Sequence, residues 1–265
     1  INTILSELQK KTYKKGTIEQ KLSDFYKLAL NVDARNKAGI SPVKPLLDEM
    51  EAAKTKADLQ KVQLKYAAQG YGVSFGGGFG ADEKNVKMNI FNLGQGGLTL
   101  GQKDYYVNND TATVAIREAF KKYVQKMFQL YGFSAEEAAQ KEQAIFQHET
   151  MLALISKSMT ELRDPQANYN KMTLKEFQEK YPNLNFEAMC NAEGIKSEYI
   201  QEMIVGQPDF LAGLDKITAA ENDNTLRALM EWDVIQSSSS YLTDEIREAN
   251  FDFFGKTMSG RKADW

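Results

Sequence analysis

The sequence predicts a mainly α-helical lobe that carries one small antiparallel β-hairpin. Apolar residues recur three and four positions apart in both the first and the last parts of the chain, as they do along one face of a helix. Capping boxes of the Ser/Thr-x-x-Glu/Gln type precede several of these runs. Glycines cluster between Gly70 and Gly97, and there the apolar residues alternate as they do in strands.

Three helices are predicted before the glycines. Thr17 to Gln20 has the form of a capping box, and apolar residues follow it at helical spacing as far as Leu30. Ser41-Pro42 fits an N-cap followed by a proline in the first turn, which predicts a helix over 43–53. Thr55 opens a third helix, which should stop at Gly70.

The predicted hairpin occupies residues 71–93. Its strands are 71–75 and 86–91, because apolar and polar residues alternate in both segments. The glycines at 76–80, together with Asp82 and Asn85, are assigned to the loop between these two strands.

Helical spacing returns from Asp110 onward. One stripe runs from Ile116 to Tyr131 and stops at Gly132, and a capping box at 134–137 opens a helix that continues past residue 155. A third capping box at 173–176 starts a helix that is broken before Pro182. A last long helix is predicted over 224–250, with the four serines at 237–240 on a face packed close to a neighbour.

Composition excludes several classes of protein. The 265 residues carry a net charge of −3 with one Cys and one His, so neither an internal disulfide nor a structural Cys/His zinc site can form. An acidic balance argues against nucleic-acid binding, and the lysines around Tyr13 are interpreted as a solvated segment. The apolar stretches are shorter than the roughly 20 residues of a membrane span.

The segment from His148 to Leu152 begins like the zinc-peptidase motif H-E-x-x-H. In that motif two histidines four residues apart bind the metal and the glutamate activates water. Here the fifth position is Leu152, and the chain has no second histidine. We therefore predict a histidine on a packed helix face, beside Ile145 and Ile155, and no metal ligand.

Three weaker patterns also carry no predicted chemistry. Glu248 and Asp252 match the E-x-x-x-D spacing of a third zinc ligand, but without a histidine pair they are interpreted as charges at a helix end. The glycines form neither G-x-G-x-x-G nor a G-K-[ST] sequence, so phosphate binding is not predicted. Acidic residues are plentiful, and no spacing singles out a pair for glycoside chemistry.

Several short segments form an ordered set along the chain. They are 82–85, 94–100, 103–106, the E-x-x-L-A string from Glu149, 162–165, 169–173, Glu231-Trp232, 250–257 and Ser259-Gly260. Together they resemble the N-terminal region of the M13, neprilysin-like zinc metallopeptidases, in which they occur in the same order. The departures are Gly101, where the family usually has proline, and Phe254, where it often has tyrosine.

This resemblance implies a two-lobed zinc peptidase, of which the chain is a large part of the helical lobe. The thermolysin-like lobe, with its zinc motif, would lie downstream, and a cavity between the lobes would admit peptides and exclude folded proteins. No catalytic or metal-binding residue is carried over onto this chain, and its substrate-binding residues stay unknown.

We therefore expect residues 1–265 to form a single helical lobe of a longer protein, because the chain opens without Met. The family resemblance carries the further expectation of a bacterial source. The whole protein is expected to be a zinc metallopeptidase with zinc in its missing catalytic domain. This chain alone is expected to be inactive and to hold no zinc.

The expected partners are the chain's own C-terminal domain and peptide substrates. The family suggests a periplasmic or exported location, with a cytoplasmic one still open. The alternatives are a free-standing helical scaffold without catalysis and a metal-free hydrolase that uses acidic residues.

Overall fold

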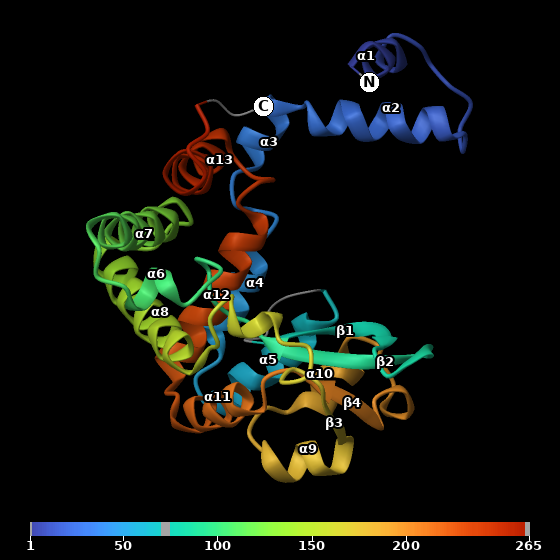
Figure 1. The fold of residues 1–265 in the computed structure, drawn as a ribbon. Coiled ribbons are helices and arrows are strands. Elements are labelled where there is room, and N and C mark those ends of the chain that lie inside the picture. Colours follow the sequence, from blue (N-terminus) through green and yellow to red (C-terminus); the bar gives the residue numbers. More distant parts are fainter. Residues whose placement is uncertain (1, 70–74, 263–265) are drawn as a thin grey trace.

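The computed structural model describes residues 2–69 and 75–262. Helices dominate it and a small sheet lies at one end, which confirms the mainly α prediction (Figure 1). None of the described helices is long and apolar enough to cross a bilayer. The α-helices are α1 (Asn2–Gln9), α2 (Ile18–Ala29), α3 (Val32–Ala38), α4 (Lys44–Ala52), α5 (Lys56–Ala67), α6 (Asp104–Val107), α7 (Thr111–Leu130), α8 (Ala135–Ile155), α9 (Leu174–Lys180), α10 (Phe186–Ala192), α11 (Pro208–Ala220), α12 (Asp223–Ser238) and α13 (Asp244–Asn250).

The remaining elements are four strands and three short helical segments. They are the strands β1 (Phe75–Asp82), β2 (Asn85–Gln95), β3 (Asn170–Thr173) and β4 (Glu202–Val205), the 3₁₀ turns η1 (Glu161–Arg163) and η2 (Ser197–Tyr199), and the π-helix η3 (Phe251–Met258). The strands pair in the order β1-β2-β4-β3, with β2 and β4 parallel and the other two pairs antiparallel.

The predicted capping boxes are confirmed at α8 and α9. At each, the N-cap hydroxyl accepts a hydrogen bond from the third helical amide, and the glutamate side chain there accepts one from the N-cap amide. At α2 only half of the box forms. The Thr17 hydroxyl accepts from the Gln20 amide, but the Gln20 side chain accepts from the Gly16 amide instead.

Three predicted helix boundaries are wrong. α8 ends at Ile155 and does not continue past it, because Ser156 adopts an extended backbone conformation. α4 begins at Lys44 after Val43, and the proline of its first turn is Pro45 rather than Pro42. The helix predicted over 224–250 is interrupted between α12 and α13. Ser238 and Ser239 turn their hydroxyls back onto the carbonyls of Val234 and Gln236, so these side chains compete for the backbone groups on which helix continuation depends.

The predicted hairpin is present, but its first strand contains the glycines that were assigned to the loop. β1 pairs with β2 from Phe75↔Gln95 to Asp82↔Asn85, while residues 71–74 lie outside the described residues. A Cβ on Gly77 would lie 2.8 Å from the Phe91 ring, so the glycine makes room for that aromatic side chain. β3 and β4, of four residues each, were not predicted.

Helix α8 connects two hydrophobic cores. Ile145 and Ala153 belong to the larger core, which α8 shares with α4, α5, α7, α12 and α13. Leu152 belongs to the second core, which lies between the sheet and α9, α10 and α11. Because α8 contributes to both, side chains on its two faces are fixed relative to the sheet and to the helices at once.

Candidate functional site

A cavity of about 290 Å³ lies where α5, α8, α11 and α12 approach the end of β2. That volume is at the lower end of small-molecule pockets, so it holds one small ligand and not an extended peptide. Its polar lining residues are Lys56, Gln60, Gln63, Thr99, His148, Glu149, Asn183, Asn185, Thr218, Glu221, Asp233 and Gln236.

Glu149 is the buried carboxylate of this cavity, with 2% of its surface exposed. Its oxygens accept hydrogen bonds from the Thr99 hydroxyl at 2.6 Å, from the Thr99 amide at 3.2 Å and from the Tyr106 hydroxyl. Burial raises the pKa of Glu149 to about 7, although these hydrogen bonds act to lower it. The carboxyl therefore gains or loses its proton close to neutral pH.

Thr99 connects this carboxylate to α12. Its hydroxyl oxygen accepts hydrogen bonds from Trp232 Nε1 at 3.1 Å and from Gln236 Nε2 at 2.8 Å. The Tyr106 hydroxyl in turn accepts from the Leu100 amide at 3.1 Å. The network thus joins α6, α8, α12 and the segment after β2 through satisfied hydrogen bonds, which is the form in which buried polar groups stabilise a fold.

The members of this network come from separate segments of the family resemblance. Thr99 lies in 94–100, Tyr106 in 103–106, Glu149 opens the E-x-x-L-A string, and Trp232 belongs to Glu231-Trp232. The sequence contains each of these segments but predicts no contact among them. The signal that was available is a lone carboxylate on an apolar helix face, which requires buried donors.

His148 lies on α8 next to Glu149 and is 3% exposed, as predicted for a packed helix face. The structure adds a partner that the sequence did not predict. His148 Nδ1 lies 2.9 Å from Glu221 Oε1, and both side chains are buried. The contact places α8 against the end of α11 without hydrogen-bond geometry between the two atoms, and it is an ion pair when the imidazole is protonated.

Lys56 closes the same end of the cavity. Its ammonium donates to the carbonyls of Thr218 at 2.6 Å and of Glu221 at 2.9 Å, at the C-terminus of α11. A cation at a helix C-terminus satisfies carbonyls that lack helical partners. Lys56 is therefore held by backbone oxygens rather than aimed at a ligand.

The other sequence candidates lie apart from this cavity. Glu248 and Asp252 are exposed near the end of α13 and in η3, and Asp252 pairs with Lys256 at 2.5 Å. Lys10, Lys11, Lys14 and Lys15 are exposed, in agreement with a solvated segment. Cys190 is buried on α10, and burial raises the pKa of its thiol to about 12, so it is unreactive at neutral pH.

The residues that the structure describes do not fit a catalytic zinc. In the parts that the structure describes, no three His, Cys, Asp or Glu side chains are grouped closely enough to hold a metal ion. The imidazole that a motif of this kind would use already faces Glu221. Glu149 has hydrogen bonds on both oxygens. The arrangement can stabilise the lobe and change protonation near neutral pH.

The whole length of this chain is similar to known proteins of one family. A sequence profile described as Peptidase family M13 matches residues 1–265. The endothelin-converting enzyme homolog of Locusta migratoria is 30% identical over 200 residues, which are 72% of this chain and 27% of that protein. Neprilysin-3 of Drosophila melanogaster is 24% identical over 254 residues, which are 89% of this chain and 32% of that protein.

A solved structure shares the fold. The zinc metalloprotease Zmp1 of Mycobacterium tuberculosis, in complex with an inhibitor, is 24% identical and superposes with a TM-score of 0.90. The match covers 99% of this chain and 40% of that chain. This chain spans about a third or less of the two curated relatives, 27% and 32%. With its fold and its whole length matched, the chain belongs to peptidase family M13.

Proposed function

We propose that this chain is the non-catalytic helical lobe of a zinc metallopeptidase. The observation that carries the proposal is the match of the family profile to the whole chain, 1–265, while the described residues offer no group that could hold a metal. A chain that spans 40% of a related zinc metalloprotease leaves room for a separate catalytic part. Zinc and the glutamate that activates its water would belong to that part, which we place downstream.

In this proposal the lobe selects substrates by size. Facing the catalytic part, it would wall a cavity that admits peptides and excludes folded proteins. The cavity of about 290 Å³ beside Glu149 is too small for this task and lies inside the lobe. The selecting surface would therefore be formed by both parts together, and this chain alone would be inactive. We propose a bacterial source and a periplasmic or exported location, with the cytoplasm as the alternative.

The experiment uses the intact polypeptide. We expect it to cleave short peptides and to lose this activity with a zinc chelator. We also expect it to leave uncut a folded protein that contains the sequences of those peptides. The same folded protein, once unfolded, is the matched control for size selection. Absence of an H-E-x-x-H motif from the intact polypeptide, or peptide cleavage that a chelator leaves unchanged, contradicts the proposal. Absence of cleavage favours the scaffold alternative.

A further inference from the structure

Helices α1 and α2 form an arm that projects from the rest of the lobe (Figure 1). On α2 the residues Ile18, Leu22 and Phe25 follow each other at helical spacing and are 73%, 47% and 72% exposed. Leu28 flanks this stripe and is 73% exposed. Four large apolar side chains on one face of a helix in water are typical of an interface and not of a free surface.

α1 and α2 pack against each other within the arm. Leu8 of α1 is 8% exposed and Ser23 of α2 is 1% exposed. The Ser23 hydroxyl donates to the Leu8 carbonyl at 2.9 Å, so α1 packs on the polar side of α2. Lys27, which a helical wheel places opposite the stripe, is exposed. The apolar stripe therefore faces away from α1 and lacks a cover among the described residues.

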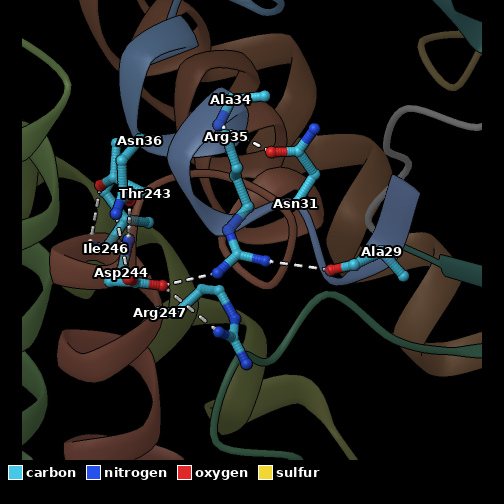
Figure 2. Close-up of polar contacts among 9 residues, drawn as sticks. All are labelled: Ala29, Asn31, Ala34, Arg35, Asn36, Thr243, Asp244, Ile246 and Arg247. Carbon is cyan, nitrogen blue, oxygen red and sulfur yellow. Dashed lines mark hydrogen bonds and ion pairs between the residues drawn. The ribbon is translucent and has the colours of Figure 1, made fainter. Parts of the chain in front are cut away.

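The base of the arm is anchored on the lobe. In α3, which follows the arm, Arg35 contacts Asp244 of α13 at 2.6 Å, and the Asn36 side chain donates to the same carboxylate at 3.0 Å (Figure 2). The Asp244 amide also donates to the Asn36 side chain at 2.8 Å. Arg35 reaches back to the Ala29 carbonyl at the end of α2, at 3.4 Å (Figure 2). These contacts fix α3 on the lobe at the base of the arm.

We propose that the apolar stripe of α2 is the docking surface for the catalytic part of the same polypeptide. This inference rests on the proposed function. The support for this inference is the length of the related metalloprotease that lies outside the shared fold. The shared fold covers 99% of this chain, arm included, and only 40% of the related metalloprotease chain. A projecting arm with a fixed base and an apolar outer face can reach a second lobe and hold it at a defined position.

A photo-crosslinker tests the proposal directly. In the intact polypeptide, Phe25→p-benzoylphenylalanine places the reactive group on the stripe, and Lys27→p-benzoylphenylalanine is the matched control on the opposite face. After irradiation, mass spectrometry identifies the crosslinked peptides. We expect position 25 to crosslink within one molecule to a peptide outside residues 1–265, and position 27 to give much less of that product. Ile18→p-benzoylphenylalanine repeats the test at a second stripe position.

Any other occupant of the apolar stripe contradicts the proposal. Crosslinks between two molecules would indicate self-association, lipid adducts would indicate a membrane surface, and no crosslink at either stripe position would leave the stripe free. Each of these overturns the proposal. The readout does not require activity, so a polypeptide that lacks a zinc motif can still show the crosslink. Failure of docking and failure of the peptidase function are thus told apart.

A charge on the stripe gives a second readout. In the intact polypeptide we expect Phe25→Asp to speed hydrogen exchange of the α2 amides at least severalfold, because the docked helix loses its cover. Lys27→Asp, the same charge on the other face, should leave that exchange close to the unaltered protein. Equal exchange for the two variants contradicts docking through the stripe.

Discussion

The polar groups between α8 and α12 and the arm of α1 and α2 depart in opposite ways from the usual distribution of residues. In the first region Glu149 and Glu231 are buried, 2% and 0% exposed. In the second, Phe25 is 72% exposed. The buried carboxylates have partners within the chain, whereas the exposed stripe does not find a cover among the described residues. An unusual residue with an internal partner indicates a structural role, and one without a partner indicates an interface.

The largest effect on stability is expected from breaking the ion pair between α8 and α12. Lys141 Nζ lies 2.5 Å from Glu231 Oε2, and the lysine side chain is 17% exposed. Lys141→Ala leaves a buried carboxylate without its cation and should lower the free energy of unfolding by about 3–5 kcal/mol. Urea denaturation followed by tryptophan fluorescence measures this loss.

Two further variants control that measurement. Lys175 pairs with Glu179 on the surface and is 86% exposed, so Lys175→Ala should change stability by less than about 0.5 kcal/mol. The double variant Lys141→Met/Glu231→Leu should recover most of the loss, because a buried pair exchanges for apolar side chains at little cost. A loss at Lys141 no larger than at Lys175 would mean that the pair does not stabilise the core.

The second effect is a pH dependence that Glu149 imposes on stability. Its pKa is about 7 in the folded chain against 4.5 for the ordinary value, so between these values only the folded state holds the proton. Stability due to this group is fully present below pH 4.5 and falls as the pH rises to about 7, by an amount on the order of 3 kcal/mol.

Glu149→Gln removes this titration and keeps the shape of the side chain. The variant should therefore show a flatter dependence of the unfolding free energy on pH across that window, whatever its stability at one pH. Glu248→Gln, at an exposed position on α13, is the matched control for the substitution itself. Identical slopes for Glu149→Gln and the unaltered chain would show that the carboxyl is not protonated in the folded state.

A smaller effect is expected inside the arm. Ser23→Ala removes the buried hydrogen bond to the Leu8 carbonyl and should cost about 1 kcal/mol, confined to α1 and α2. Hydrogen exchange of the α1 and α2 amides should become faster, while amides of α8 and α12 keep their rates. Ser6→Ala, at an exposed position on α1, is the control. A change that spreads to α8 would mean that the arm and the lobe unfold together.

The smallest effect is expected on the stripe itself. In this 265-residue chain alone, Phe25→Asp replaces a side chain that is 72% exposed and should change the free energy of unfolding by less than about 0.5 kcal/mol. The same variant should affect the intact polypeptide, where the stripe is covered. A loss in the isolated chain as large as that of Lys141→Ala would mean that Phe25 packs within the lobe.

The helices were predictable where local signals were strong. Apolar spacing located α7, and a capping box located the start of α8, because a Ser N-cap satisfies the first amides whatever surrounds it. The break at Ser239 was not predictable in this way, since helical spacing continues through it. The extent of strand β1 was not predictable from spacing, because the need for glycine at Gly77 is set by Phe91 of the neighbouring strand.

The candidate site was predictable only in part. That His148 is buried followed from its apolar neighbours on the helix, but its contact with Glu221 spans 73 residues of sequence that carry no local signal for it. The stripe of α2 has ordinary helical spacing in the sequence, and only the structure shows that this face is exposed. Non-local pairing and exposure are tertiary properties, which spacing along one helix does not encode.

The central claim, that the chemistry lies outside this chain, is tested most directly by changing its single histidine in the intact polypeptide. His148→Gln should leave the zinc content of the purified protein unchanged and should keep chelator-sensitive peptide cleavage within about twofold in kcat/KM. The melting temperature is measured alongside, to separate any loss of fold. A folded His148→Gln protein that has lost its zinc and its activity together would contradict the account, because it would place the metal centre in this lobe.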